Sequence, residues 1–235
     1  MPTGTRLTAL PEPKNKTKHD RTMDENLKNN QNYVIAIGRQ FGCGGREVGQ
    51  RIAQLLDINY FDKQLLLEAS KASGIQPEMF EAADERTPKF FPSLWPLNIA
   101  MAGSTFGGEI PMSDDSIYQA QCRVMKDLVD RKSCVIVGRT ADYVLRDHCR
   151  VISVFLHAPI DNRVARIIER GDCDTKEAAE KRCDKINKLR AEYYNFYTDK
   201  LWGHADSYDL CIDSSLLGIE GTAQLIVEFV KQRLQ

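Results

Sequence analysis

Glycine and arginine residues at positions 38–49 of this chain are spaced in a way that suits phosphate binding. Gly42, Gly44 and Gly45 lie in a glycine-dense turn over residues 38–49, after an apolar run and before an amphipathic one. Glycine adopts positive φ and lets a ligand approach the backbone, so successive N–H groups can point into one hollow. At a helix N-terminus such a hollow favours an anion. We expect the turn to hold the phosphates of a nucleoside triphosphate through Gly42, Cys43, Gly44, Gly45, Arg46 and Glu47.

The turn departs from the usual phosphate-binding loop, G-x-x-x-x-G-K-[ST]. Gly45 stands in the place of the lysine and Arg46 in the place of the hydroxyl residue. Negative charge on the β- and γ-phosphates must then be neutralised by Arg46 or Arg39. The hydroxyl side chain that usually binds Mg²⁺ is missing, so the sequence does not identify the metal ligands. The alternative is a tight strand-to-helix turn that binds no ligand, although such a turn does not need this many glycines.

Two polar side chains directly follow predicted strands. Arg139 comes after an apolar run at residues 134–137, and Asp62 comes after one at residues 58–61. Ligands of open parallel sheets gather at the carboxyl ends of strands, so both are candidates for binding the acceptor. Alternatively, Arg139 is a surface arginine beside a turn. Asp62 could instead hold Mg²⁺ through water or cap the next helix.

A third group of arginines lies in residues 163–190, which mix basic and acidic side chains. Arg163 and Arg166 are three residues apart, on one face of a helix, and Arg190 precedes an aromatic cluster. Such a segment predicts a lid over a transferring phosphoryl group, although solvated helices also carry mixed charge. We expect charge neutralisation by the catalytic candidates Arg46, Arg139, Arg163, Arg166 and Arg190.

The elements that must position these residues alternate between short β-branched runs and longer amphipathic ones. Strands are predicted at residues 33–37, 58–61, 134–137, 151–156 and 208–212. Helices are predicted at about 46–56, 63–73, 115–132, 159–170 and 218–234. This alternation favours an α/β fold with a mostly parallel sheet covered by helices on both faces.

The rest of the chain limits the class of protein. Residues 1–32 are predicted to be a disordered tail, either a regulatory arm or a cloning remnant, which leaves one domain at 33–235. The proline-rich residues 87–113 predict a functional cover or a surface loop. A net charge of −1 gives no global field for nucleic acid or an anionic membrane. Scattered cysteines and the lack of a long apolar run predict a cytoplasmic protein.

Three motifs resemble the cytidylate kinase-like family, a branch of the nucleoside monophosphate kinases among the P-loop kinases. They are GRQFGCGGREVG, VIVGRTADYVL, and RAEYYNFYTDKLWG with YDLCID. The resemblance implies a five-stranded parallel sheet of order 2-3-1-4-5. It also implies an acceptor-binding insertion at about 62–115 and a lid at about 163–198.

The resemblance further implies ATP-dependent phosphoryl transfer, with Mg²⁺, to a small acceptor such as CMP. Arg139 matches the arginine of the family's G-R-D motif, where this chain has Thr140 in place of the aspartate. Asn187 and Arg190 stand at the spacing of a lid aspartate and arginine. The alternative is a nucleotide- or anion-sensing module that kept this fold and lost transfer.

Overall fold

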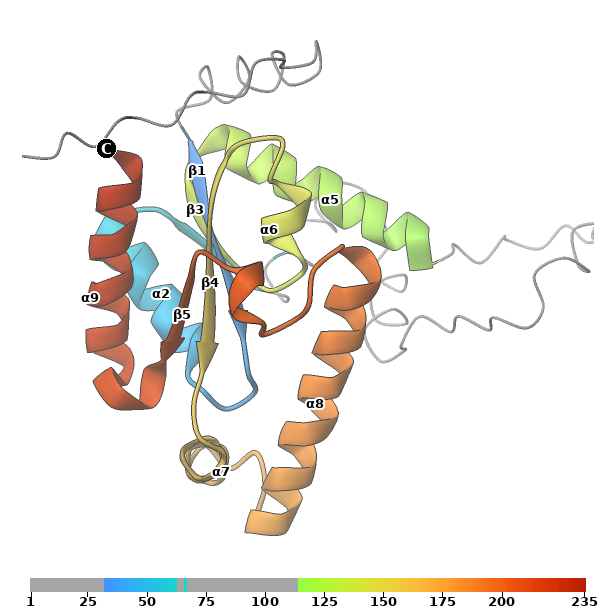
Figure 1. The fold of residues 1–235 in the computed structure, drawn as a ribbon, viewed down its shortest axis with the longest axis vertical. Coiled ribbons are helices and arrows are strands. Elements are labelled where there is room, and N and C mark those ends of the chain that lie inside the picture. Colours follow the sequence, from blue (N-terminus) through green and yellow to red (C-terminus); the bar gives the residue numbers. More distant parts are fainter. Residues whose placement is uncertain (1–31, 63–65, 67–113) are drawn as a thin grey trace, which may run out of the picture.

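The chain folds around one five-stranded parallel sheet, seen in a computed structural model that describes residues 32–62, 66 and 114–235 (Figure 1). The strand order β2-β3-β1-β4-β5 confirms the expected 2-3-1-4-5 arrangement. The strands are β1 (Tyr33–Arg39), β2 (Asn59–Phe61), β3 (Cys134–Val137), β4 (Arg150–His157) and β5 (Leu210–Asp213). The predicted tail, most of the predicted insertion and the helix expected at 63–73 lie outside the described residues.

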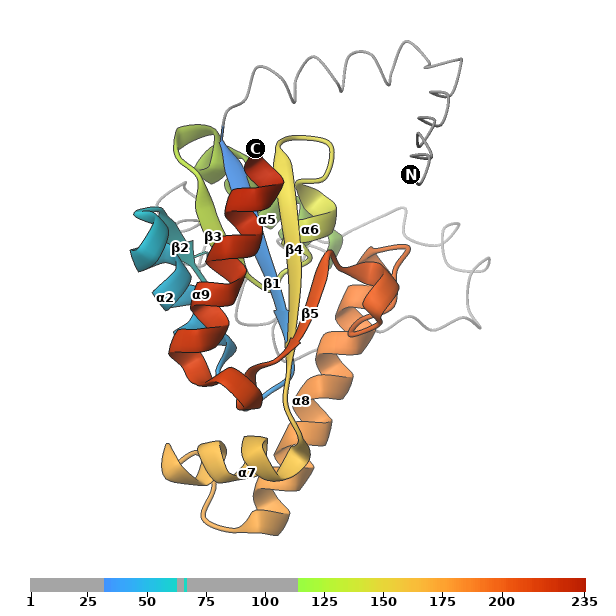
Figure 2. The same cartoon turned by 60° about the vertical axis from the view of Figure 1, so that its left-hand side comes forward.

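Helices cover both faces of the sheet, as expected. They are α2 (Gly45–Leu56), α5 (Asp114–Arg131), α6 (Ala141–Val144), α7 (Ile160–Glu169), α8 (Lys176–Tyr197) and α9 (Ser214–Leu234), with a 3₁₀ turn at Ala205–Ser207. Helices α2 and α9 lie together on one face, and α5 and α6 lie on the other (Figures 1 and 2). Helix α7 lies beyond the carboxyl end of β4, and α8 packs on it. None of the described helices has the length and apolar character to cross a bilayer.

The central strand β1 is buried on both faces, which explains its unbroken apolar sequence. Ile35 and Ile37 pack into the cluster under α2 and α9, and Val34 and Ala36 into the cluster under α5 and α6. None of the four is more than 3% exposed. Because β1 pairs with β3 and β4, the residues that follow it lie at the carboxyl edge of the sheet, beside those that follow its neighbours.

Residues 163–190, interpreted from the sequence as one basic segment, belong to two helices, the first of which corresponds to the helix predicted at about 159–170. Helix α7 ends at Glu169, and Gly171 takes a left-handed φ of 73° before the chain turns. Helix α8 begins at Lys176, where the hydroxyl of Thr175 accepts a hydrogen bond from the N–H of Ala178 at 3.2 Å. A small cluster that includes Ile167 and Cys183 joins the two helices. The turn therefore folds the basic segment back on itself.

Candidate functional site

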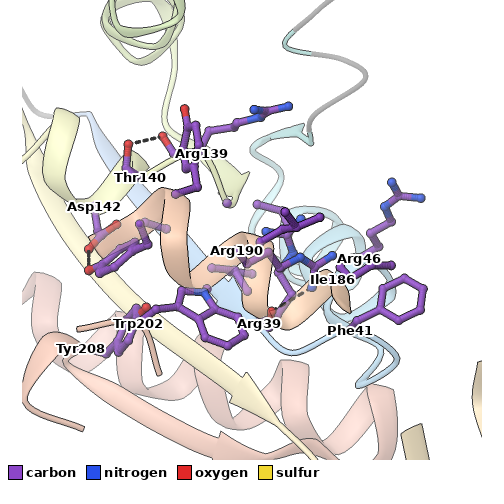
Figure 3. Close-up of a pocket in the computed structure, with 18 of the residues that line it drawn as sticks. Arg39, Phe41, Arg46, Arg139, Thr140, Asp142, Ile186, Arg190, Trp202 and Tyr208 are labelled. Atoms are coloured by element: carbon purple, nitrogen blue, oxygen red, sulfur yellow. Dashed lines mark hydrogen bonds between the residues drawn. The ribbon is translucent and has the colours of Figure 1, made fainter. Parts of the chain in front are cut away.

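A cavity of about 460 Å³ opens where β1 and β3 end, with α8 as its opposite wall (Figure 3). Its walls hold five arginines and several aromatic residues. They are Arg39, Arg46, Arg139, Arg182, Arg190, Phe41, Tyr193, Tyr194, Trp202 and Tyr208. Asp142 is the acidic residue among the lining residues. The cavity is thus strongly cationic at a place where a parallel sheet usually binds ligands.

The glycine turn has the backbone conformation that was expected of it. Gly42 and Gly44 have left-handed φ angles of 84° and 82°, and α2 begins at Gly45. The first N–H groups of an α-helix have no acceptor within the helix, and its N-terminus carries partial positive charge. A Cβ on Gly42 would lie 2.8 Å from the backbone oxygen of Arg163. Gly42 is therefore required both by its φ angle and by the approach of α7.

Cys43 fills space in this turn. Its side chain is buried, and Sγ lies 3.5 Å from the carbonyl oxygen of Leu156. Burial raises the pKa of the thiol, which leaves it protonated and unreactive at neutral pH. The hydroxyl of Ser214 donates to the carbonyl oxygen of Cys43 at 2.7 Å, which ties the turn to the start of α9.

Arg39 lies between the glycine turn and the end of β3. A Cβ on Gly45 would lie 2.8 Å from Cγ of Arg39, and one on Gly138 would lie 2.2 Å from its Nη1. The side chain therefore crosses from the end of β1, over the first residue of α2, to the end of β3. Burial, followed by repulsion from Arg139, lowers the pKa of Arg39 to about 10.

Arg190 of α8 approaches Arg39 from the opposite wall. Its Nη1 donates to the backbone carbonyl of Arg39 at 2.9 Å. Burial, followed by repulsion from Arg39, lowers the pKa of Arg190 to about 8. Among the residues that the structure describes, no carboxylate forms an ion pair with Arg39 or Arg190. Two guanidinium groups thus face a cavity without a counter-charge, which is costly unless an anion binds between them.

Phe41 holds the basic residues of α7 and α8 over the turn. The guanidinium carbons of Arg170, Arg182 and Arg190 lie 5.9, 5.6 and 5.7 Å from the centre of its ring. The backbone N–H of Phe41 donates to Oδ1 of Asn187 at 2.8 Å. Because Phe41 belongs to the glycine turn, these contacts fix α8 relative to that turn.

Arg139 follows β3 in an unusual backbone conformation. Gly138, Arg139 and Thr140 have successive φ angles of 85°, 60° and 52°. Non-glycine residues with such angles are rare and concentrate at functional sites. The hydroxyl of Thr140 donates to the carbonyl of Arg139 at 2.6 Å, and the Arg139 guanidinium lies 5.8 Å from the centre of the Tyr193 ring. Arg139 therefore lines the cavity, as expected, and it does so through a left-handed backbone turn that the strand pattern does not predict.

Four other candidates surround the glycine turn, and of these Arg46 alone also lines the cavity. Nε of Arg46 lies 3.5 Å from Oδ2 of Asp62, and the Arg46 side chain is 60% exposed. Nη1 of Arg166 lies 3.7 Å from Oε1 of Glu47 and packs beside Gly44. Each of these charged side chains around the turn therefore already has an oppositely charged partner: Arg46 with Asp62, and Arg166 with Glu47.

The structure does not bring Arg163 into the cavity. Its side chain is buried behind the turn, and Nε donates to the carbonyl of Ala158 at 2.9 Å. Nη1 has no hydrogen-bond partner among the described residues. Although Arg163 and Arg166 are on the same short helix, only Arg166 reaches the outer side of the glycine turn.

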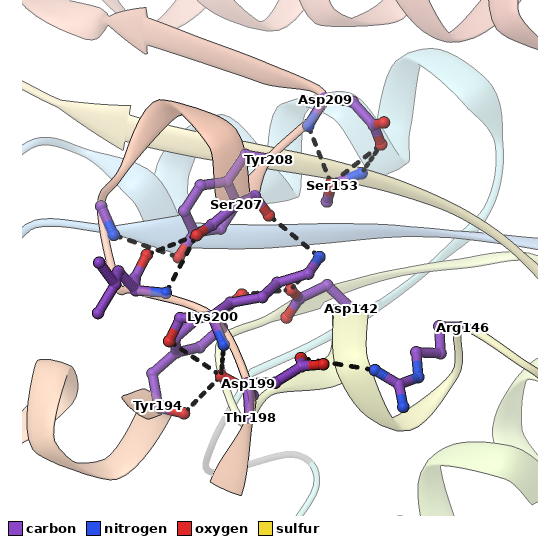
Figure 4. A network of polar contacts seen from close by, with 12 residues as sticks. Asp142, Arg146, Ser153, Tyr194, Thr198, Asp199, Lys200, Ser207, Tyr208 and Asp209 are labelled. Carbon is purple, nitrogen blue, oxygen red and sulfur yellow. Dashed lines mark hydrogen bonds and ion pairs between the residues drawn. The ribbon is translucent and has the colours of Figure 1, made fainter. Parts of the chain in front are cut away.

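A buried carboxylate anchors the end of α8 (Figure 4). Oδ2 of Asp142 accepts a hydrogen bond from the hydroxyl of Tyr194 at 2.7 Å and lies 3.9 Å from Nζ of Lys200. Burial raises the pKa of Asp142, and these two partners oppose that shift. Nearby, Asp209 accepts from the backbone N–H of Ser153 at 2.8 Å, which fixes the approach to β5.

Replacing Asp142 by asparagine is expected to make stability less dependent on pH. A carboxyl whose pKa is raised by folding stabilises the protein when protonated, so this contribution is lost as the pH rises through the folded-state pKa. Wild type should therefore lose stability relative to Asp142→Asn over the pH range that begins near about 4, the ordinary pKa of an aspartate, and extends up to the raised pKa of Asp142. Melting temperatures of both proteins across this range measure the difference. Parallel curves would contradict the expectation.

Several lining residues were not singled out from the sequence. Arg39 was only an alternative to Arg46, and Phe41, Asp142, Arg182 and Trp202 were not candidates. Phe41 could have been noticed, because a large aromatic residue inside a glycine turn is unexpected. The other positions carry no local signal, since only the packing of α6, α8 and β5 brings them to one cavity.

The described residues do not form a protein-held metal site. No cluster of three or more potential ligands exists among them, and Arg46 occupies the place of the usual hydroxyl ligand. Asp62 and Glu47 are both paired with arginines.

Comparisons with known proteins agree with this geometry. A cytidylate kinase from Methanococcus aeolicus is 30% identical over 196 residues, which cover 82% of this chain and 94% of the relative. The crystal structure of an uncharacterised protein from Eubacterium ventriosum has a TM-score of 0.63 and 26% identity, covering 85% of this chain and 99% of that one. Residues 34–216 match the model of the cytidylate kinase-like family. The chain therefore belongs to the cytidylate kinase-like family.

Proposed function

We propose that this protein transfers a phosphoryl group from ATP to a small phosphate-bearing acceptor, with CMP as the first candidate. The observation that carries the proposal is the pair Arg39 and Arg190, which face the cavity without an acidic partner among the described residues. A transferring phosphoryl group spreads negative charge over its oxygens and would supply the missing counter-charge. Family membership supports phosphoryl transfer as the general chemistry.

The donor would bind at the glycine turn. Backbone N–H groups of residues 42–47 and the N-terminus of α2 would hold its phosphates. Arg166 and Arg46 would exchange their present partners, Glu47 and Asp62, for phosphate oxygens. Phosphoryl transfer asks for positioning and charge stabilisation rather than covalent catalysis, so these contacts and Arg190 would supply most of the rate.

The acceptor would lie in the cavity, with its phosphate toward the arginines. In Figure 3, Phe41 and Arg46 are at one end of the view, and Asp142 and Tyr208 are at the other. Trp202 also lines the cavity, so this second end offers aromatic faces and a carboxylate to a planar group that carries hydrogen-bond donors. A nucleotide has both a phosphate and such a group. Arg139 and Asp62 are the proposed contacts to the acceptor.

An assay of ADP release against a panel of nucleoside monophosphates tests the proposal. We expect turnover with at least one acceptor in the presence of Mg²⁺, and a melting temperature raised by ATP. ATP-dependent stabilisation without ADP release with any acceptor would favour the sensing module, a possibility raised by Gly45 and Arg46 in place of the lysine and the hydroxyl residue. Neither stabilisation nor turnover would contradict both functions.

A further inference from the structure

The phosphate loop of this protein has exchanged the positions of its glycine and its cation. In the pattern G-x-x-x-x-G-K-[ST], Arg39 stands at the first glycine and Gly45 stands at the lysine. The loop thus lacks its usual cation at the start of α2 and gains one at the end of β1. One glycine and one cation occupy these two positions in both patterns, so the number of cations is unchanged.

The side chain of Arg39 occupies the space that Gly45 leaves. A Cβ on Gly45 would lie 2.8 Å from Cγ and 2.9 Å from Cβ of Arg39. Any larger residue at position 45 would therefore collide with the inner, inflexible part of the arginine side chain. Arginine at position 39 and glycine at position 45 are mutually dependent.

The far end of Arg39 depends on a second glycine. A Cβ on Gly138 would lie 2.2 Å from Nη1 and 3.1 Å from Cζ of Arg39. The guanidinium therefore rests against the backbone where β3 ends, at the cavity wall. The Arg39 backbone is also fixed, because its carbonyl accepts the hydrogen bond from Arg190 at 2.9 Å. Both ends of the residue are thus held.

Arg46 fits the cationic role less well, although it follows the lysine position in sequence. Its side chain is 60% exposed and already lies 3.5 Å from the Asp62 carboxylate. Arg39 has no such partner among the described residues, and its pKa is lowered to about 10 by burial and by Arg139. The group that lacks a counter-charge is the one that gains most from a phosphate.

We propose that Arg39 replaces the phosphate-loop lysine, reaching the donor phosphates from the end of β1 through the space left by Gly45 and Gly138. This inference rests on the proposed function. A guanidinium offers a planar fork that can hold two phosphate oxygens at once, whereas a lysine acts as a single point charge. The loop therefore binds the donor with a fixed geometry rather than a mobile charge.

Restoring the ordinary pattern tests the exchange. Arg39→Ala should weaken ATP binding and transfer by about 100-fold. Gly45→Lys alone should also be impaired, because the new side chain collides with Arg39. Arg39→Gly together with Gly45→Lys should recover at least about tenfold over either single variant, since the two effects are coupled rather than additive. A double variant that is no better than the singles would overturn the proposal.

A second comparison decides the matter if the double variant does not fold. Arg39→Ala must lose at least about tenfold more ATP affinity than Arg46→Ala, and equal losses, or a larger loss in Arg46→Ala, would overturn the proposal. Arg51→Ala, which removes the ion pair of this α2 residue with Glu220 of α9, is the folding control, because neither residue lines the cavity. ATP affinity is measured by calorimetry and transfer by ADP release. Failure of wild type to transfer would refute the proposed function alone, because ATP affinity still reports on Arg39.

Discussion

Replacing Gly138 by alanine is expected to lower phosphoryl transfer by about 100-fold, because a misplacement of about 1 Å in a positioning group has effects of this size. The new Cβ would lie 2.2 Å from Nη1 of Arg39. Since this atom is the far end of a flexible side chain, the arginine can swing away instead of unfolding the protein. The variant should also lose about 1 kcal/mol of stability from the φ of 85° at this position.

Gly171→Ala is the matched control for this prediction. Gly171 has a similar φ of 73°, and a Cβ there would meet nothing within 4 Å. Both variants should therefore lose a similar amount of stability in denaturant unfolding, while only Gly138→Ala loses transfer in the ADP-release assay. If both variants kept full activity, or both lost it equally, the position of the Arg39 guanidinium would not matter for transfer.

Replacing Arg190 by alanine is expected to reduce kcat/KM by about 100- to 1000-fold, the usual effect of removing one donor to developing charge. The stability of the free protein should stay the same or rise. Burial and repulsion from Arg39 lower the pKa of Arg190 to about 8, so its charge is unfavourable at this place in the free protein. A residue that costs stability and supports activity is typical of a functional site.

Lys188→Ala tests whether the effect is specific to Arg190. Lys188 lies on the same helix, with a side chain that is 77% exposed and a weak contact to Glu192. This variant should keep both activity and melting temperature. A marked loss of melting temperature in Arg190→Ala would instead mean that the hydrogen bond to the Arg39 carbonyl mainly holds α8 in place, and that the residue is structural.

Much of the fold could be predicted from local patterns. The four-residue apolar run at β3 and the longer one at β4 have lengths and β-branched content that favour strands, and their ends were predicted within a residue. Only the motif resemblance indicated the strand order, because pairing depends on contacts between distant segments. The helix predicted at about 159–170 corresponds to α7, whereas α8 was not predicted as a helix because its charged sequence has no clear apolar period.

The sequence alone predicted a turn at residues 42–47 that suits a phosphate, because a glycine turn between strand and helix is a local feature whose conformation follows from neighbouring residues. The proposal that Arg39 is the cation that serves that turn could be argued only from the tertiary structure. Arg46 is the nearer choice in sequence, but Asp62 already matches its charge. Arg39 faces the cavity because Gly45 and Gly138, from α2 and the end of β3, leave room for it. Such room is a property of packing between distant segments, which sequence spacing does not encode.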